Sequence, residues 1–415
     1  MRKGLGRVAS LLLALGIGSL AYGQGTIKIG VIYPLSGNTA SAGNQAKAGV
    51  ELAAEIINNA HPEFEPLPLA KGAGLPNLGG AKLELVIADH QGNPSVGQSQ
   101  TVRLITQEKV VAMMGSYESS VSMTATAVAE RYGIPFVVGD SVAADITGRG
   151  FKSVFRTTPI ASDLARTYID FLTALKSAKN IKVETVALVN ENTDYGTSTA
   201  TSIAAAAEAK GFKVLARIPY GKNTADVSPQ VLQMKELKPD VAIFVSYTSD
   251  AILYVKTMQN LNYKPTICIG EDAGFTDPAT VDAVGSQMKG IFNRSAWSPG
   301  KPGSLTFRLN ELYKKRTGQD ITDPTARTIQ GFFTLADAIN RAGSTKPEAI
   351  IAALKATDEK ASQMIVGYSG VQFDEQGQNK LAATFITQLY GKEYLTVFPL
   401  DLAEHALEYP YKGWQ

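Results

Sequence analysis

The chain has 415 residues, a formal net charge of +2 and 44% hydrophobic residues. This length is enough for two domains of ordinary size, and the near-neutral charge without a basic run argues against a nucleic-acid or anionic-membrane partner. Cys268 is the single cysteine, which excludes an internal disulfide, and no cysteines and histidines cluster in a zinc-binding pattern. We therefore expect neither a metal nor another cofactor.

The first 23 residues have the pattern of a secretory signal peptide. Arg2, Lys3 and Arg7 form a basic start, residues 8–20 are apolar, and residues 21–23 place small residues at the cleavage-determining positions. A membrane anchor is the alternative, but the apolar run is shorter than the roughly 20 residues that a spanning helix needs. The sequence predicts cleavage of residues 1–23 and export of the mature chain.

Downstream, apolar strands alternate with helices. In the first long helix, Ala46, Val50, Ala53 and Ile57 form one apolar stripe, which is typical of a helix packed on a sheet. Such alternation predicts parallel sheets covered on both faces, with ligands bound beyond the carboxyl ends of the strands. The predicted strands are residues 26–33, 82–89, 110–115, 134–139, 185–190, 213–220, 240–246 and 266–270.

Residues 61–80 interrupt this rhythm. The segment is rich in proline and glycine and has no clear periodicity, which predicts a surface insertion. An arm that binds a partner and an inert loop are both compatible with it.

Polar residues follow several of these strands. Ser119 and Ser120 stand where the third strand gives way to a helix, and either hydroxyl could serve only as a helix cap. However, a helix start at the mouth of a parallel sheet also offers unpaired N–H groups and a positive dipole end, which together can hold a carboxylate. Tyr195, Tyr247 and Asp272 follow three further strands, so two sets of strand ends would face each other across a cleft.

Asp140, Ser141 and Val142 follow the fourth strand. Gly139-Asp140-Ser141-Val142-Ala143 has the Gly-x-Ser-x-Ala spacing of a nucleophile elbow, with His405 as a distant candidate base. This arrangement would make the protein a secreted hydrolase. The order of the residues along the chain does not establish a triad, and we expect binding rather than catalysis.

Several long segments resemble the type I periplasmic solute-binding proteins of branched-chain (hydrophobic) amino acid ABC transporters. The segments that carry the resemblance are "IKIGVIYPLSGNTASAGNQAKAGVELAAEIIN", "VVAMMGSYESSVSMTATAVAERYGIPFVV", "SVFRTTP", "VALVNENTDYGTSTATSIAAAAEAKGFKV", "KPDVAIFVSYTSDAILYVKTMQNLNY" and "GVQFDEQGQ". The resemblance spans nearly the whole mature chain. It implies a type I α/β fold of two doubly wound parallel-sheet lobes joined by three crossovers. Lobe one would comprise residues 24–156 plus 292–368, and lobe two residues 157–291 plus 369–415.

The resemblance also implies roles for individual residues. Ser119 would hold the solute's carboxylate, the Asp140 carbonyl and the Asp272 carboxylate would bind its ammonium, and Tyr195 would form an aromatic wall. Val142 stands where the family has a hydroxyl, so Ser141 or water would have to replace that contact. Together with Ala42 in place of an aromatic residue, this departure leaves room for a larger or less strictly zwitterionic solute.

The family implies a monomeric periplasmic protein that delivers its solute to an inner-membrane ABC permease. Two alternatives stay open. The same fold could report the ligand to a signalling partner, or the solute could be an aromatic acid, another organic acid or an amide rather than an amino acid.

Overall fold

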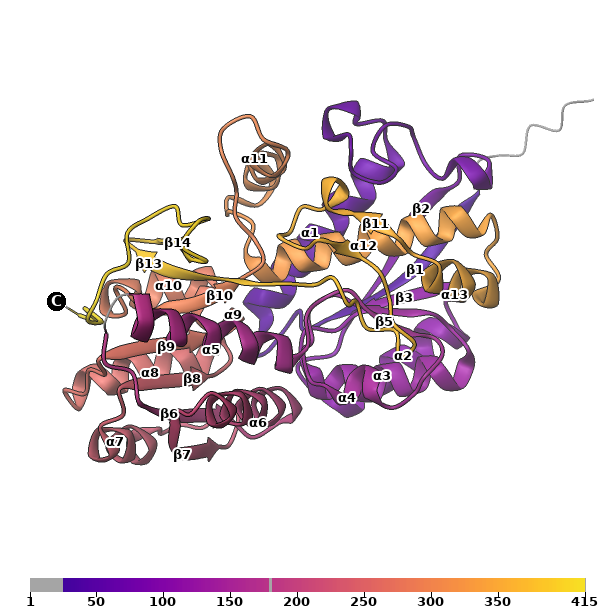
Figure 1. Ribbon diagram of the computed structural model, residues 1–415. Helices are drawn as coiled ribbons and strands as arrows, with labels where there is room; N and C mark the ends of the chain where they lie inside the picture. The colour runs from indigo at the N-terminus through magenta and orange to yellow at the C-terminus, as the bar shows by residue number, and fades with distance from the viewer. Residues whose placement is uncertain (1–24, 179–180, 415) are drawn as a thin grey trace, which may run out of the picture.

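The computed structural model describes residues 25–178 and 181–414 (Figure 1). The predicted signal peptide lies outside these residues. No helix in the described ranges is long and apolar enough to cross a membrane.

The first lobe contains a five-stranded parallel sheet in the order β2-β1-β3-β4-β5. Its strands are β1 (Thr26–Tyr33), β2 (Lys82–Asp89), β3 (Ala112–Gly115), β4 (Phe136–Val138) and β5 (Val154–Arg156). The helices of this lobe are α1 (Ala40–Asn58), α2 (Pro94–Thr106), α3 (Ser119–Tyr132), α4 (Asp145–Gly148), α11 (Leu305–Thr317), α12 (Asp323–Ala342) and α13 (Pro347–Lys355).

The alternation of side chains along β1 explains why helices cover both faces of this sheet. Ile29 and Val31 belong to the apolar core shared with α1 and α12, whereas Ile32 belongs to the core shared with α2 and α3. The predicted stripe of α1 is buried. A strand buried on both faces must be apolar throughout, as this one is.

The second lobe contains a seven-stranded sheet in the order β14-β13-β10-β9-β8-β6-β7. The strands are β6 (Thr185–Glu191), β7 (Lys213–Tyr220), β8 (Val241–Val245), β9 (Ile267–Glu271), β10 (Phe292–Ser295), β13 (Phe385–Tyr390) and β14 (Glu393–Phe398). The helices are α5 (Ala161–Ala178), α6 (Asp194–Ala209), α7 (Ser228–Leu237), α8 (Thr248–Asn260), α9 (Ala273–Thr276) and α10 (Pro278–Val284). Strands β6 to β10 are parallel, but β13 and β14 add an antiparallel edge that the expectation of purely parallel sheets did not include.

The structure corrects two of the predicted lobe boundaries. Residues 292–295 form β10, which hydrogen-bonds to β9 and β13 of the second sheet, so lobe one resumes after Ser295 rather than at residue 292. Near the third crossing, Arg156 in lobe one donates its backbone N–H to Gly377 and its Nε–H to the Gln378 side chain. The chain therefore still packs on lobe one beyond residue 369 and joins lobe two at β13.

The insertion at residues 61–80 is anchored to lobe one. It contains two short 3₁₀ helices, Pro62–Phe64 and Pro76–Leu78, and buries Phe64, Leu67 and Leu75 in the core. The Gly74 N–H also donates to the carbonyl at residue 57 in α1. The turn-rich sequence thus forms a packed loop.

Candidate functional site

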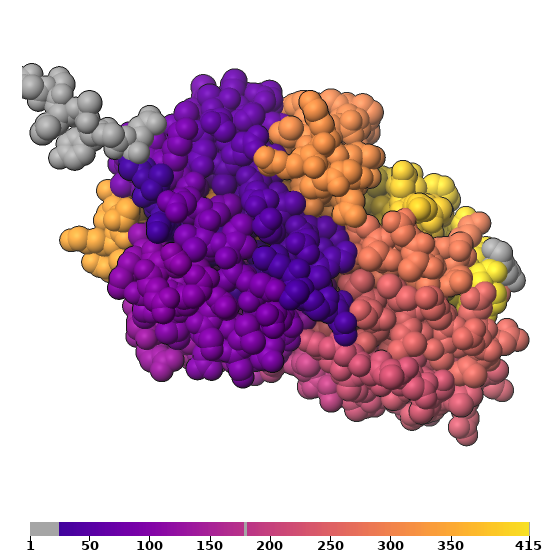
Figure 2. Space-filling model, turned by 180° about the vertical axis from the view of Figure 1, so that it is seen from behind, coloured from indigo at the N-terminus to yellow at the C-terminus, as the bar shows by residue number. Residues whose placement is uncertain are grey.

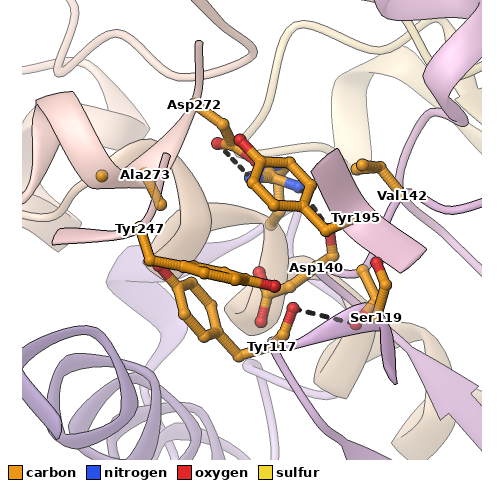
Figure 3. Close-up of a pocket in the computed structure, with 11 residues that line it drawn as sticks. Tyr117, Ser119, Asp140, Val142, Tyr195, Tyr247, Asp272 and Ala273 are labelled. Carbon is orange, nitrogen blue, oxygen red and sulfur yellow. Dashed lines mark hydrogen bonds and ion pairs between the residues drawn. The ribbon is translucent and has the colours of Figure 1, made fainter. Parts of the chain in front are cut away.

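A pocket with about 290 Å³ of unfilled space, part of it open to solvent, lies between the carboxyl ends of the two sheets (Figure 3). Both lobes contribute residues to it. The lining residues are Tyr117, Ser119, Asp140, Ser141, Val142, Tyr195, Tyr247, Asp272, Ala273, Gly274 and Arg327. A smaller neighbouring cavity between the lobes shares Ala273 and includes Ala42, the position where the resembled family often has an aromatic residue.

Seven of the eight predicted site residues line this pocket, and Ser120 does not. Ser119 and Ser120 are the first two residues of α3, and successive side chains on a helix point about 100° apart. When Ser119 faces the cleft, Ser120 must therefore turn away from it. The side chain of Ser119 is buried, whereas that of Ser120 is partly exposed.

The start of α3 offers free hydrogen-bond donors. The backbone N–H groups of Ser119 and Ser120 lie in the first turn, which no carbonyl of the helix can reach, and they donate to no other group in the described residues. The Ser119 Oγ accepts a hydrogen bond from the Ala143 N–H at 3.3 Å, which leaves its own proton available. This end of the pocket can therefore accept an anionic group.

Ser141 has a structural role in this arrangement. Its Oγ lies 2.7 Å from the Ser122 Oγ and 3.0 Å from the Tyr117 carbonyl, so its hydroxyl links the loops after β3 and β4. Beside it, Val142 presents a buried apolar side chain to the pocket.

Asp140 is buried at the base of the pocket, with only 3% of its surface exposed. Its Oδ2 accepts a hydrogen bond from the Thr328 hydroxyl at 2.6 Å, and its Oδ1 has no partner in the described residues. Burial raises the pKa of Asp140 to about 7, although Arg327 and the Thr328 hydroxyl lower it. The Asp140 carbonyl, which the resemblance assigns to the ammonium, instead accepts from Arg327 Nη1 at 2.9 Å.

Three tyrosines form the wall of the pocket. The ring centroids of Tyr117 and Tyr247 are 5.8 Å apart, and those of Tyr195 and Tyr247 are 5.0 Å apart. The Tyr195 hydroxyl donates to the Glu271 carboxylate, whereas the hydroxyls of Tyr117 and Tyr247 are buried without a hydrogen-bond partner in the described residues. Burial raises the pKa of each phenol well above its usual value, so all three are neutral.

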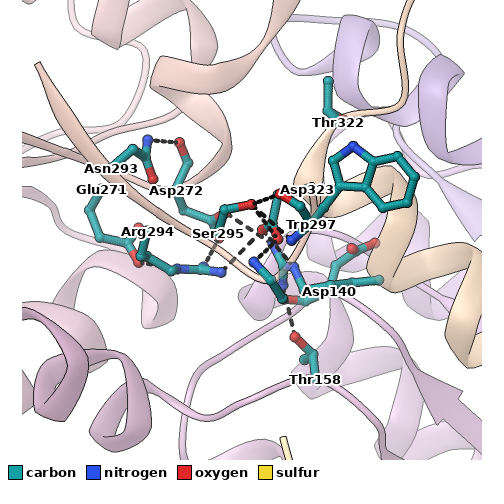
Figure 4. A network of polar contacts seen from close by, with 12 residues as sticks. Asp140, Thr158, Glu271, Asp272, Asn293, Arg294, Ser295, Trp297, Thr322 and Asp323 are labelled. Atoms are coloured by element: carbon teal, nitrogen blue, oxygen red, sulfur yellow. Dashed lines mark hydrogen bonds and ion pairs between the residues drawn. The ribbon is translucent and has the colours of Figure 1, made fainter. Parts of the chain in front are cut away.

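Asp272 lines the pocket but is not free to act as the predicted countercharge. Its Oδ1 accepts from Arg327 Nη2 at 3.0 Å, and its Oδ2 lies 2.5 Å from Arg294 Nη2 (Figure 4). The same two arginines also bind Asp323, and Arg294 binds Glu271 as well. Both carboxylate oxygens of Asp272 are thus paired with guanidinium groups of the protein.

Four lining residues were not predicted: Tyr117, Ala273, Gly274 and Arg327. Tyr117 is close to Ser119 in the polar segment after β3, and Ala273 and Gly274 directly follow Asp272. Their closeness in sequence to predicted site residues could have identified them as lining residues. Arg327 comes from α12, far along the chain from any of these strand ends. Its only local signal is Asp323 four residues earlier, a spacing that brings an acid and a base together on a helix.

The backbone of the pocket is constrained at Tyr117 and Asp272. Tyr117 has φ = 82° and Asp272 has φ = 56°, in the left-handed region that side-chain-bearing residues rarely adopt. Gly274 approaches the residue after β8 so closely that a Cβ would lie 1.9 Å from the Ser246 carbonyl oxygen. Strained positions of this kind tend to collect at binding sites.

The two lobes also contact each other around the pocket. On the face shown in Figure 2, they meet along a continuous boundary. Ser41 Oγ donates to Asp277 Oδ1 at 2.7 Å, and Lys222 Nζ of lobe two lies 3.1 Å from Glu118 Oε1 of lobe one. The structure therefore represents the arrangement in which the lobes are closed over the pocket.

Two α/β lobes that close over a polar pocket at the carboxyl ends of their sheets define a two-lobed solute-binding protein. Residues 26–391 match the family described as Periplasmic binding protein. The chain belongs to this family.

Individual relatives agree with this assignment. The chain is 31% identical over 407 residues to Leu/Ile/Val-binding protein homolog 8 of Brucella suis, which covers 95% of this chain and 96% of the relative. It is 30% identical over 401 residues to Leu/Ile/Val-binding protein homolog 7 of Brucella abortus, covering 94% of this chain and 96% of that one.

Solved structures share the fold at lower identity. The leucine-binding protein LivK from Thermotoga maritima has a TM-score of 0.75 and 21% identity, covering 91% of this chain and 100% of its own. A solute-binding protein from R. palustris in complex with benzoate has a TM-score of 0.75 and 18% identity, covering 90% of this chain and 96% of its own. The predicted type I fold and the family resemblance are thereby confirmed.

Proposed function

We propose that this protein captures a small amino-acid-type solute in the cleft between its lobes and delivers it to an inner-membrane ABC permease. The observation that carries the proposal is the pocket itself, where donors from the start of α3 and buried polar groups without partners face the same space. The names of the Brucella relatives, which refer to leucine, isoleucine and valine, support an amino acid as the solute.

The proposal includes export through cleavage of residues 1–23 and action as a monomer, without nucleic acid. Solute binding would shift an equilibrium between open and closed lobes, because the solute touches both faces of the cleft only when they close.

We also propose that the protein has no hydrolytic activity. The Ser141 hydroxyl is bonded to Ser122 and to the Tyr117 carbonyl, and no hydrogen bond in the described residues joins Ser141 to His61, His90 or His405. A nucleophilic serine needs a base within hydrogen-bond reach.

A thermal-shift screen of amino acids, amides and aromatic acids tests the function, followed by calorimetry on each hit. We expect at least one amino acid to raise the melting temperature and to bind with one-to-one stoichiometry. Ala273→Trp places a large side chain beside both cavities and should remove that binding, whereas the exposed Leu402→Ala should leave it unchanged. Binding that survives Ala273→Trp would place the solute outside the cleft and contradict the proposal.

A further inference from the structure

Three buried polar atoms of the pocket lack a partner in the described residues: Asp140 Oδ1 and the hydroxyls of Tyr117 and Tyr247. All three residues line the same cavity, and Figure 3 shows the Asp140 carboxylate beside the rings of Tyr117 and Tyr247. An unpaired buried polar atom costs free energy, so a cluster of three indicates a ligand group that completes them. An ionised carboxylate oxygen only accepts, so the group that completes Asp140 Oδ1 carries donors, and the phenol hydroxyls can accept from the same group.

The charges around the pocket also favour a ligand group with donors and a positive charge. Arg294 and Arg327 pair with three buried carboxylates, those of Glu271, Asp272 and Asp323 (Figure 4). Arg327 reaches only the backbone carbonyl of Asp140, whose carboxylate is bonded in the described residues by the Thr328 hydroxyl alone. Arg327 already makes four hydrogen bonds to protein acceptors. No cationic side chain of the described residues pairs with the Asp140 carboxylate, and a positive group on the solute would supply that partner.

We propose that the side-chain carboxylate of Asp140 binds the positively charged amine of the solute through Oδ1, so that the pocket selects amine-bearing acids over acids without an amine. This inference rests on the proposed function and assigns to Asp140 the role that the family resemblance gave to Asp272. Asp272 is unsuited to the role because Arg294 and Arg327 occupy both its oxygens.

The surroundings of Oδ1 fit an ammonium group. The Thr328 hydroxyl holds Oδ2 at 2.6 Å and so fixes the plane of the carboxylate, which leaves Oδ1 as its free atom. The rings of Tyr117 and Tyr247 add electron-rich faces that attract cations, and their hydroxyl oxygens can accept N–H donors. The donors at the start of α3 lie elsewhere on the pocket wall, so an amino acid could place its carboxylate at Ser119 and its amine at Asp140.

Burial raises the pKa of Asp140 to about 7, which reflects the cost of a carboxylate without a full countercharge. An ammonium beside Oδ1 would remove that cost. A second carboxylate beside Oδ1 would instead increase that electrostatic cost.

Calorimetry at pH 8 on the purified protein tests the inference, using the twenty L-amino acids, the matching α-hydroxy acids and benzoate as probes. For the amino acid that binds most tightly, we expect the α-hydroxy acid, which has the same shape without the charge, to bind at least a hundredfold more weakly. In Asp140→Asn, we expect the affinity for that amino acid to fall at least a hundredfold and the preference over the hydroxy acid to shrink below tenfold.

Asp277→Asn is the matched control. Asp277 is also buried and lines the neighbouring cavity, but not the main pocket, so its loss can weaken closure yet should leave the preference for the amine intact. Asp140→Asn keeps an acceptor for Thr328, and its melting temperature reports whether it folds. If Asp140→Asn does not fold, the wild-type protein alone decides. A wild-type affinity for the amino acid less than tenfold higher than that for the hydroxy acid overturns the inference.

Other outcomes also decide between the two proposals. If an amino acid binds and Asp140→Asn keeps both affinity and preference, Asp140 is not the amine site, although solute capture stands. If only benzoate or hydroxy acids bind, the protein is a solute-binding protein for acids without an amine, and the assignment of Asp140 is wrong. If nothing in the panel binds, the proposed amino-acid function fails and the inference fails with it.

Discussion

Lys222 and Glu118 form an ion pair that joins the two lobes, and its removal should weaken solute binding without unfolding either lobe. Lys222 Nζ lies 3.1 Å from Glu118 Oε1 and donates to the Gly92 carbonyl at 3.2 Å. The side chain of Glu118 is fully buried and that of Lys222 is 15% exposed, so solvent screens the pair little. Besides Lys222, Glu118 accepts a hydrogen bond from the Thr39 hydroxyl at 2.9 Å.

Lys222→Met keeps the apolar stem and removes the charge. A hydrogen bond to a charged group contributes about 1.5–3 kcal/mol. At about 1.4 kcal/mol per tenfold change in affinity, this corresponds to solute binding weaker by about 10-fold to 150-fold. The cost falls on the closed form, because Glu118 regains water when the lobes separate. The melting temperature of the solute-free protein should therefore change little.

Calorimetry with the amino acid found in the screen measures this effect, together with thermal unfolding of the solute-free protein. Lys392→Met is the control, because Lys392 pairs with Asp282 at an exposed site within lobe two and such pairs contribute little. Adding Glu118→Gln to Lys222→Met should recover part of the affinity, since no buried charge is then left alone. An unchanged affinity in Lys222→Met would refute the reasoning, as would a loss confined to thermal stability.

Three further predictions concern single residues. Ser119→Ala should weaken binding of a carboxylate-bearing solute at least tenfold, because a hydrogen bond of about 1.5–3 kcal/mol is lost. Ser120→Ala, one residue away and outside the pocket lining, should bind the solute normally. Equal losses of affinity in the two variants would contradict the assignment of Ser119. Asp272→Asn should lower the free energy of unfolding by about 3–5 kcal/mol, because two buried guanidinium groups lose their shared carboxylate. Urea denaturation measures this change. An unchanged free energy of unfolding would show that the network does not stabilise the fold. Burial raises the pKa of Glu359 to about 8 from an ordinary value of 4.5, so the folded state holds this proton more tightly and loses stability as the pH rises from about 4.5 to 8. Glu359→Gln should therefore raise the melting temperature at pH 8.5 and change it little at pH 4.5, and an equal change at both pH values would exclude ionisation as the cause.

The sequence predicted the location of the pocket because parallel strands bring their carboxyl ends to one edge of a sheet. Asp140, Tyr247 and Asp272 each follow a strand, so the alternation of strands and helices was enough to place them near one another. Helical geometry also separates Ser119 from Ser120, but only after the first residue of α3 is known.

The pairing of Asp272 could not be predicted from the sequence. Its partners Arg294 and Arg327 lie on β10 and α12, and only the packing of α12 against the ends of both sheets brings the three charges together. A polar residue at a strand end indicates a site, but whether its charge is free depends on neighbours distant in the chain. The antiparallel β13 and β14 were missed because a tight turn joins them, without the intervening helix on which the predicted alternation relies.

A crystal structure of the protein with the amino acid that binds most tightly would test the central claim most directly. We predict that the solute lies in the pocket between the lobes, with its carboxylate within hydrogen-bond distance of the N–H groups at Ser119 and its amine on Asp140 Oδ1, beside Tyr117 and Tyr247. A solute bound outside this pocket would contradict the account, as would one whose amine contacts Asp272 in place of its arginine partners.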